Sequence, residues 1–446
     1  MKACSRRTVF AVFMGLILFG WSGSFPAALA EQIDVVSPES VGMSKERLAN
    51  IDSIVEKAVK EKQVKGMVVL VARHGKIAYF KAFGEMYESR PMERDAVFRW
   101  ASMTKTVTVA AFMQFWDRGK FQLKDPVSKY IPEFKNLQVA EMGEEGQIKL
   151  VPAKRQVTIH DLLAFTGGFT ATYMAGLGPI HKYVAEKYAE RGVQDLATEH
   201  YTKPLKENVK SIAKCPLAFH PGEAWGYNQV SMDIAAYLVE VFSGKPFNRY
   251  IREDLFGPLG SDEVWFYPPE SVFPRIPAVY NNPGKLVELT KSWTMGTGTI
   301  GPNYTFSKNK AYFGAATSLH GTTYDYYKFA QMLLNKGEYN GVRVLSRQAV
   351  EAMTTVQVGE GPQYRNIFSG TTGWGYGVDI QETAKMNSLS DWYGGPGSYG
   401  WRGFWSTMFF NDPIDDTVVL TMAQTPRHGY PLGLRINVAA GASIVE

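Results

Sequence analysis

The feature that most constrains the fold is a predicted helix that is apolar on nearly all of its faces. It begins near Ser102-Met103-Thr104-Lys105 and continues through the apolar residues Val107, Val109, Ala110, Ala111, Phe112, Phe115 and Trp116. A helix that is hydrophobic all round must be enclosed by other elements, so the chain has to fold around it. With 446 residues, 45% of them hydrophobic, the chain is long enough to build such a core.

The start of this helix carries a pair of side chains with chemical potential. Ser102 and Lys105 are three positions apart and therefore lie on one helical face. An amine so placed can accept the proton of a nucleophilic hydroxyl, although serine is also a common helix N-cap. The same Ser-x-x-Lys pattern occurs at Ser211–Lys214 and Ser307–Lys310. Neither of those copies leads into a long apolar helix, so we expect chemistry at the first copy alone.

Hydrophobic periodicity elsewhere predicts a mixture of helix and sheet. The first part of the chain predicts a helix over 44–62, capped by Ser44, and a β-hairpin of 67–73 and 77–84. The last part predicts a helix over 323–335, strands over 404–410 and 417–424 joined by a turn at 411–413, and a helix over 432–444. The middle predicts helices over 158–165 and 230–242, and the long segment 170–222 between them has no clear assignment.

These elements predict an α/β (α+β) fold in which an antiparallel sheet is flanked by helices and joined by a mostly helical lobe. Residues 31–446 are expected to form one domain. The α/β lobe comprises about 41–97 and 311–446, and the helical lobe comprises about 98–310. An active site is expected in the cleft between the lobes, where ligand sites commonly lie.

The first 30 residues resemble an export signal. Lys2, Arg6 and Arg7 form a basic start, an apolar run over 9–21 comes next, and Ala28-Leu29-Ala30 is typical of a cleavage site. An uncleaved membrane anchor is the alternative, although the apolar run is short for a bilayer span. We therefore expect an exported protein, periplasmic or secreted, with no stable membrane insertion once the signal is removed.

Charge and motifs argue against several other functions. The formal net charge is +5, and it falls to +2 without the three basic residues of the signal, so a nucleic-acid partner is not expected. The sequence has no His-Glu-x-x-His and no Cys-x-x-Cys pattern, and its seven histidines are scattered, so neither a metal nor another cofactor is expected. Cys215 is the single cysteine after the signal and is expected to be a structural thiol.

Several segments become recognisable when they are taken together. They are Phe98-Arg99-Trp100-Ala101-Ser102-Met103-Thr104-Lys105, the segment 123–134, Thr158-Ile159-His160-Asp161-Leu162-Leu163 with Thr166-Gly167-Gly168-Phe169, Pro221-Gly222, and the segment 329–335. With them the chain resembles, from about residue 41 to 424, the serine β-lactamase-like hydrolases. The resemblance is closest to class C β-lactamases and the carboxylesterases related to them.

The resemblance implies a set of catalytic residues. Ser102 is the implied nucleophile, and Lys105 and Tyr227 together are implied to activate it and to protonate the leaving group. The backbone N–H groups of Ser102 and Phe404 are implied to form the oxyanion hole. Tyr227-Asn228-Gln229 stands where the family has Tyr-x-Asn, so Gln229 departs from that pattern. The alternative for Tyr227 is a buried aromatic residue with a hydrogen-bonded hydroxyl.

A third motif bears on the substrate. Trp401-Arg402-Gly403 stands where β-lactamases have Lys-Thr-Gly, at the predicted start of the strand over 404–410. The lysine of that motif faces a substrate carboxylate, so Trp401 suits a neutral ester better, whereas Arg402 could restore the charge. Gly403 is expected to let the backbone approach a substrate closely. Gln229, Trp401, Arg402 and Gly403 are thus the implied substrate-binding residues.

The sequence therefore predicts a serine hydrolase that acts on a small-molecule ester. The alternatives are an amide hydrolase (a β-lactamase, a D-amino-acid peptidase or an amidase), an acyltransferase, and a non-catalytic penicillin- or peptidoglycan-binding protein. Further aromatic and apolar residues either form a substrate wall or belong to the ordinary core: Tyr173, Met174, Trp265, Tyr267, Trp293 and Met295. The oligomeric state is left open.

Overall fold

The computed structural model describes residues 33–281, 286–359, 361–364, 373–381, 394–426 and 429–446. The chain divides into two units, Met1–Asp34 and Val35–Glu446, and the helices and strands of the described residues belong to the second unit. The predicted export signal lies outside the described residues.

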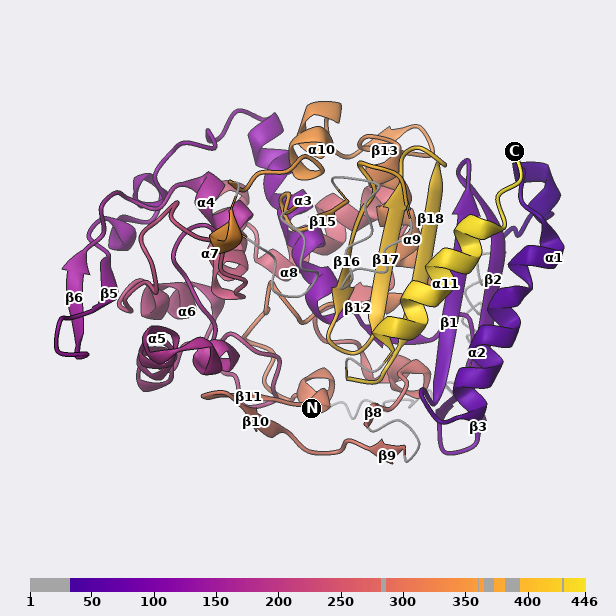
Figure 1. Ribbon diagram of the computed structural model, residues 1–446, viewed down its shortest axis with the longest axis horizontal. Helices are drawn as coiled ribbons and strands as arrows, with labels where there is room; N and C mark the ends of the chain where they lie inside the picture. The colour runs from indigo at the N-terminus through magenta and orange to yellow at the C-terminus, as the bar shows by residue number, and fades with distance from the viewer. Residues whose placement is uncertain (1–32, 282–285, 360, 365–372, 382–393, 427–428) are drawn as a thin grey trace, which may run out of the picture. The chain divides into compact units, whose positions relative to one another are not determined.

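A seven-stranded antiparallel sheet, in the order β15-β16-β17-β18-β1-β2-β3, forms the main sheet of the second unit. Its strands come from both ends of the chain, as Figure 1 shows by their colours. They are β1 Gly66–Arg73, β2 Lys76–Tyr87, β3 Arg90–Pro91, β15 Asp379–Ile380, β16 Tyr399–Gly403, β17 Thr407–Asp412 and β18 Thr417–Ala423. β1 lies near the centre and pairs with β18 from Met67↔Ala423 to Arg73↔Thr417. The predicted antiparallel sheet is thus confirmed.

The first hairpin has a sequence reason for its tight turn. β1 and β2 are joined by His74 and Gly75, whose φ angles of 54° and 70° are both positive. Two such residues form the turn type whose twist matches that of the flanking strands. All eight residues of β1 are buried, as expected for a strand covered on both faces.

Helices cover both faces of the main sheet. On one face lie α1 Lys45–Leu48, α2 Asn50–Lys60 and α11 Tyr430–Ala442, with Ile51, Phe410 and Ile436 in one apolar cluster. On the other face lies α9 Thr323–Leu334, where Tyr326 packs on Phe409 with ring centroids 5.2 Å apart. The alternation of Phe409 and Phe410 follows from the two-residue period of a strand.

The second part of the unit is built around the apolar helix, α3 Thr104–Asp117. Twelve of its residues, from Thr104 to Phe115, are buried, which confirms that the helix is enclosed. Its other helices are α4 Ile159–Ala164, α5 Pro179–Glu190, α6 Leu205–Ile212, α7 Val230–Ser243 and α8 Phe247–Tyr250, and α10 Arg347–Met353 packs on α3. The segment 170–222, unassigned from the sequence, contains a 3-10 helix, Thr172–Leu177, and then α5 and α6.

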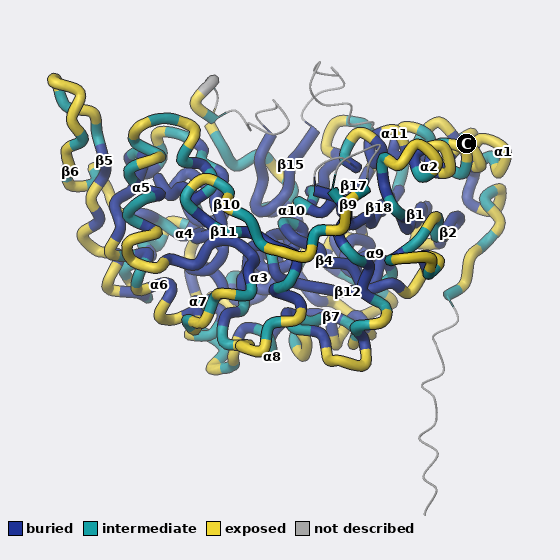
Figure 2. Tube along the Cα trace, turned by 90° about the horizontal axis from the view of Figure 1, so that it is seen from below, coloured by how far each residue is buried: buried dark blue, intermediate teal, exposed yellow. Residues whose placement is uncertain are grey.

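The region expected to be mostly helical also contains short strands. They are β4 Val97–Arg99, β5 Gln138–Met142, β6 Ile148–Pro152, β7 Val264–Trp265, β8 Tyr280–Asn281, β9 Val287–Glu288, β10 Trp293–Met295 and β11 Gly298–Ile300. β4 and β7 flank β12 His320–Thr322 in a small sheet, and β13 Glu338–Tyr339 pairs with β14 Val342–Arg343. Figure 2 shows that the hairpin of β5 and β6 ends in an exposed tip.

The predicted strand over 404–410 is wrong in its bounds. Residues 404–406 form the turn between β16 and β17, where Ser406 has a φ of 65° and its N–H donates to Gly403 O at 2.9 Å. Gly403 therefore ends one strand instead of preceding the next. The second of these strands continues to Asp412, so the turn falls at 413–416 instead of at the predicted 411–413. The apolar run Phe404-Trp405 misled the prediction because aromatic residues are enriched in strands.

Candidate active site

Ser102 lies at the junction between β4 and α3. It sits inside a 3-10 helix, Ala101–Met103, and the cap position of α3 is occupied by Met103. The residue before it, Ala101, has a φ of 47°, a left-handed conformation that costs energy in a residue other than glycine. Backbone strain of this kind is concentrated at functional sites, and here the strained residue immediately precedes Ser102. Ser102 is therefore not the simple N-cap that the sequence also allowed.

Lys105 is fully buried beside this serine. Its Nζ donates to Ser102 Oγ and to the carbonyl oxygen of Ala316, each at 3.2 Å. Burial lowers the pKa of Lys105 well below its ordinary 10.5, and the carboxylates of Asp233 and Asp195 partly oppose that shift. The desolvated ammonium is unfavourable, so the site favours a neutral amine within reach of the serine hydroxyl.

Tyr227 stands over the same lysine. The Lys105 Nζ lies 4.6 Å from the centroid of the Tyr227 ring, and the Trp401 indole donates to the Tyr227 hydroxyl at 3.1 Å. Burial raises the pKa of Tyr227, while hydrogen bonds with Ser102 and Trp401 act in the opposite direction. The phenol is thus favoured over the phenolate, and Ser102, Lys105 and Tyr227 form one compact group.

The end of β16 is held against the backbone that precedes Ser102. A Cβ on Gly403 would lie 2.2 Å from the carbonyl oxygen of Trp100 and 2.2 Å from Thr407 Oγ1, which itself donates to Trp100 O at 3.0 Å. Gly403 is required because one backbone passes against another. This glycine therefore makes room for Trp100, and its approach to a substrate stays a prediction. The next residue, Phe404, is brought to the pocket.

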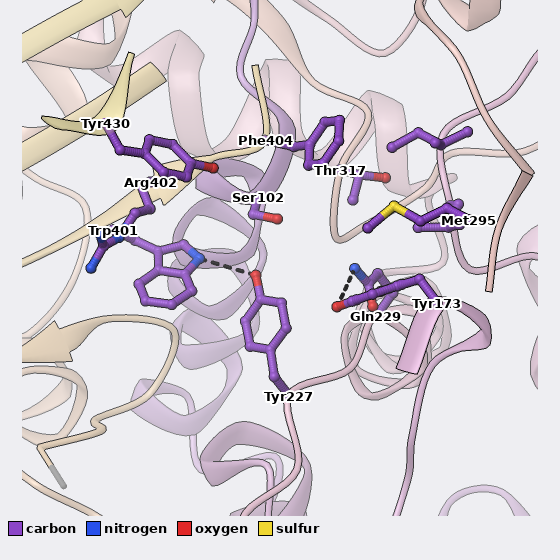
Figure 3. Close-up of a pocket in the computed structure, with 12 residues that line it drawn as sticks. Ser102, Tyr173, Tyr227, Gln229, Met295, Thr317, Trp401, Arg402, Phe404 and Tyr430 are labelled. Carbon is purple, nitrogen blue, oxygen red and sulfur yellow. Dashed lines mark hydrogen bonds between the residues drawn. The ribbon is translucent and has the colours of Figure 1, made fainter. Parts of the chain in front are cut away.

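A pocket of about 290 Å³ opens over Ser102 (Figure 3). Its lining consists of Ser102, Tyr173, Leu196, Tyr227, Gln229, Met295, Ile300, Thr317, Trp401, Arg402, Phe404 and Tyr430. In Figure 3, Trp401, Arg402 and Tyr430 stand on one side of the serine, and Tyr173, Gln229 and Met295 stand on the other. The lining is mainly apolar and aromatic, and Arg402 is the one charged side chain among these described residues.

Gln229, which stands at the third position of the Tyr227-Asn228-Gln229 motif, lines this pocket. Its Nε2 donates to the Tyr173 hydroxyl at 3.1 Å. The preceding Asn228 has another task, because its Oδ1 accepts from Ser231 N at 2.8 Å at the start of α7. The middle residue of Tyr227-Asn228-Gln229 is therefore structural, and the outer two line the pocket.

The predicted apolar wall is only partly found at the pocket. Tyr173 and Met295 line it, whereas Trp293 packs behind it, 6.1 Å from Trp405 between ring centroids. Trp265 packs in a separate cluster with Val97 and Val272. The others belong to the interior: Met174 is buried, and the Tyr267 hydroxyl donates to the Tyr312 carbonyl.

Sequence reasoning missed several residues of the pocket. Leu196, Ile300, Thr317 and Tyr430 carried no motif, and Tyr430 donates to Gly403 O at 2.9 Å from the start of α11. Two buried acids near Lys105 were also missed. Burial raises the pKa of Asp195 to about 6 and that of Asp233 to about 7. For Asp233, the sequence signal that could have identified it is its position as an acid among the apolar residues of α7.

The other two Ser-x-x-Lys copies differ from the first. Ser211 Oγ accepts from Lys203 at 3.4 Å, and Ser307 Oγ donates to the Asn309 carbonyl at 2.9 Å. Lys214 and Lys310 are both exposed, unlike Lys105. Cys215 is buried as a free thiol, and burial raises its pKa to about 12, which disfavours the reactive thiolate.

The described part of the chain contains neither a metal-binding cluster nor a membrane-spanning helix. Within it, His, Cys, Asp and Glu form no group of three or more that could hold a metal ion. None of its helices is both long enough and apolar enough to cross a bilayer.

Known proteins share this architecture along most of the chain. Residues 51–442 match the beta-lactamase family. Protein Rv1367c of Mycobacterium tuberculosis is 29% identical over 80% of this chain and 85% of its own. Esterase EstB of Burkholderia gladioli is 26% identical over 85% of this chain and 91% of its own. The structure of EstCE1, a hydrolase with promiscuous acyltransferase activity, superposes with a TM-score of 0.72 over 88% of this chain and 99% of its own, at 22% identity. The chain therefore belongs to the beta-lactamase family and is an enzyme of the serine hydrolase type.

Proposed function

We propose that this enzyme hydrolyses uncharged carboxylic esters through an acyl-enzyme on Ser102. The observation that carries the proposal is the 3.2 Å contact between Ser102 Oγ and the buried Lys105 Nζ, beneath a mainly apolar pocket. A lysine whose pKa is lowered by burial gives up its proton more readily than an exposed lysine, and the resulting amine can act as a base.

The proposed acylation step is built on this geometry. Lys105 Nζ takes the proton of Ser102 Oγ while that oxygen attacks the ester carbonyl carbon. The carbonyl oxygen becomes an anion, to which the backbone N–H groups of Ser102 and Phe404 donate. Removing one such donor costs roughly 2.7–4 kcal/mol of barrier in other enzymes. The carbon–oxygen bond to the alcohol then breaks, and the alcohol oxygen receives its proton from Lys105 by way of the Tyr227 hydroxyl.

Deacylation repeats these roles with water. A water molecule attacks the acyl carbon and gives a proton to Lys105 through Tyr227. The bond between the acyl carbon and Ser102 Oγ breaks, Lys105 returns the proton to Ser102 Oγ, and the carboxylic acid leaves. The Tyr227 phenol is favoured by burial, so this residue passes protons instead of starting the reaction as a phenolate.

The preference for an uncharged ester is supported at position 401. The lysine that faces a substrate carboxylate in β-lactamases is replaced by Trp401, which is buried and donates to Tyr227. An indole N–H engaged in that way offers no positive charge to a substrate carboxylate. Amide hydrolysis, β-lactam hydrolysis and acyl transfer to an alcohol are the competing reactions, and a single set of substrates distinguishes them.

The test compares the wild-type enzyme with Ser102→Ala on short-chain p-nitrophenyl esters, nitrocefin and peptides ending in D-alanyl-D-alanine. We expect ester turnover that is lost in Ser102→Ala, together with a mass increase equal to one acyl group on Ser102 after rapid quenching. Equal ester rates for the two proteins would contradict the proposal. Nitrocefin turnover as fast as ester turnover would favour a β-lactamase, and ester product formed from an added alcohol would favour an acyltransferase. A covalent label that never turns over would favour a binding protein.

We also propose that the enzyme is exported and acts in the periplasm or outside the cell. The basic start, the apolar run over 9–21 and Ala28-Leu29-Ala30 support a cleaved signal. The mass of the protein recovered from a periplasmic extract should correspond to a chain that begins at Glu31. A full-length chain retained in the cytoplasm would contradict export.

A further inference from the structure

One side of the pocket is formed by an apolar cluster drawn from three separate segments. Four residues of this cluster line the pocket and are here called the aliphatic wall, because three of them have aliphatic side chains: Tyr173, Leu196, Met295 and Ile300. They pack in one cluster with Ala197 and Trp405. In Figure 3, Tyr173 and Met295 stand across Ser102 from Trp401 and Tyr430.

A single buried carboxylate joins the first two of these segments. Thr172 N donates to Asp195 Oδ2 at 2.7 Å, and Thr172 Oγ1 donates to Asp195 Oδ1 at 2.7 Å. Asp195 is 1% exposed. Thr172 immediately precedes Tyr173, and Asp195 immediately precedes Leu196. The carboxylate therefore fixes the distance between two backbones that each carry one residue of the aliphatic wall.

The third segment, the hairpin of β10 and β11, is fastened to the same threonine. Thr297 N donates to the Thr172 carbonyl oxygen at 3.0 Å, and Thr297 Oγ1 donates to the Ala185 carbonyl oxygen at 3.2 Å. A Cβ on Gly296 would lie 2.3 Å from Thr172 O, and a Cβ on Gly298 would lie 2.1 Å from Thr172 Oγ1. The hairpin thus passes directly over Thr172, and it carries Met295 and Ile300.

The side of the pocket that receives the acyl group is set by the proton path. A general acid must lie within hydrogen-bond reach of the oxygen that it protonates. The Tyr227 hydroxyl, which passes the proton to the alcohol, accepts from Trp401 and so lies toward the Trp401 side. The alcohol is accordingly directed toward Trp401 and Tyr430, and the acyl group toward the aliphatic wall.

We infer that Asp195 is a positioning residue that holds the aliphatic wall, through Thr172, as a preformed site for an uncharged aliphatic acyl chain. This inference rests on the proposed esterase function. A wall made of three segments that are far apart in sequence keeps its shape only if they are tied together, and Asp195 and Thr172 supply that tie. A site fixed before binding loses less entropy when the acyl chain enters it.

The test is an acyl-length series of p-nitrophenyl esters from acetate to octanoate. In the wild-type enzyme, kcat/KM should rise by about fourfold for each methylene that the aliphatic wall buries. Thr172→Val keeps the side-chain size but removes the hydroxyl donor, and Asp195→Asn weakens the acceptor. Thr172→Val should lower kcat/KM for the hexanoate ester on the order of tenfold, equal to the loss of one or two buried methylenes, while acetate hydrolysis changes less than about twofold. Asp195 also acts on the pKa of Lys105, so for Asp195→Asn the expected result is a similar fall in the ratio of hexanoate to acetate kcat/KM. The matched control Thr172→Ser keeps the donor and should retain the wild-type series.

Additional readouts separate positioning from a general loss of structure. Leu196→Ala enlarges the pocket at the aliphatic wall and should move the highest kcat/KM to longer acyl chains. This variant tests whether the wall binds the acyl chain even if Asp195→Asn does not fold. A series of butyrate esters with different alcohols should give the same relative rates in Thr172→Val as in the wild type. An unchanged acyl-length series in both Thr172→Val and Leu196→Ala would overturn the inference. Absence of any ester turnover in the wild type would instead overturn the proposed function.

Discussion

The indole N–H of Trp401 donates to the hydroxyl of Tyr227 over 3.1 Å. This bond joins the residue that replaces a substrate-binding lysine to the residue that is proposed to carry protons. It also lowers the pKa of Tyr227 against the larger effect of burial. The residue at position 401 therefore acts on the Tyr227 hydroxyl as well as lining the pocket.

Trp401→Phe tests that link. The variant keeps an aromatic ring but loses the donor to Tyr227, so the phenol should become harder to deprotonate. We expect kcat for short esters to fall by about tenfold, equal to roughly 1.4 kcal/mol, the size of one hydrogen bond. Steady-state kinetics check this, with Tyr227→Phe as the comparison. If Trp401→Phe were additive with Tyr227→Phe, the two residues would act independently.

Lys105→Met should separate activity from stability. The substitution keeps an unbranched side chain of similar length and removes an amine that is fully buried. We expect ester turnover to fall by at least about 10³-fold because the base is lost. We also expect the free energy of unfolding to rise by about 1–2 kcal/mol, because burying a polar group costs energy. Urea unfolding at pH 7 checks the second effect, and an unfolded or less stable variant would contradict it.

The pH dependence of kcat/KM should report the pKa of Lys105. Burial lowers that pKa, so the ascending limb should lie well below the ordinary lysine value of 10.5. The Asp233 and Asp195 carboxylates raise it, and Tyr227 faces the same amine. Asp233→Asn removes one negative charge, so its limb should move to lower pH. As a control, Glu270→Gln removes an exposed charge and should leave the ascending limb in place. A shift of the limb to higher pH in Asp233→Asn would contradict the role given to the Asp233 carboxylate.

The same acids should shape stability against pH. Burial raises the pKa of Asp233 from 3.8 to about 7 and that of Asp195 to about 6. Between about pH 4 and 7 the folded chain therefore binds more protons at these residues than the unfolded chain. Their contribution to the free energy of unfolding is present below about pH 4 and is lost as pH rises to about 7. Chemical unfolding of the wild type and Asp233→Asn across this range should show a smaller decline in the variant. Parallel curves would contradict the assignment.

Gly403→Ala should displace β16 from the backbone that precedes Ser102. The added Cβ would lie 2.2 Å from the Trp100 carbonyl oxygen, so β16 and the backbone before Ser102 must separate. We expect destabilisation of about 1–3 kcal/mol, as for other overpacked sites, together with a fall in kcat. Gly176→Ala is the control, since its Cβ would have open space around it. Thermal unfolding and ester kinetics check both variants.

The fold was predictable where periodicity and capping agree. Ser44 caps α1 through Arg47 N, and Thr322 and Asp325 form a reciprocal cap at the start of α9, near the predicted helix limits. The strand limits at 399–412 were not predictable, because Phe404 and Trp405 have strand-like side chains but form a turn. The positive φ of Ser406 there is a conformation that serine rarely adopts, so the residue type does not signal it.

The arrangement of the candidate catalytic residues was predictable in part, where they are close in sequence or follow a recognisable segment. Ser102 and Lys105 are local on one helix, and Tyr227 comes after a recognisable Pro221-Gly222. Leu196, Ile300 and Thr317 are brought to the pocket by tertiary contacts alone, so no local pattern marks them. The Ala316 carbonyl that accepts from Lys105 carries no side-chain signal at all.

The pairing of β1 with β18 has a consequence for how the chain matures. These neighbours in the sheet are separated by nearly the whole length of the domain, from Met67↔Ala423 to Arg73↔Thr417. Contacts this remote in sequence fold slowly, and the main sheet cannot close until synthesis reaches its last strands. A growing chain therefore remains without its finished sheet, and without the pocket that the sheet supports, until almost all of it has been made. Reactivity of Ser102 toward a fluorophosphonate would consequently mark the moment when folding is complete.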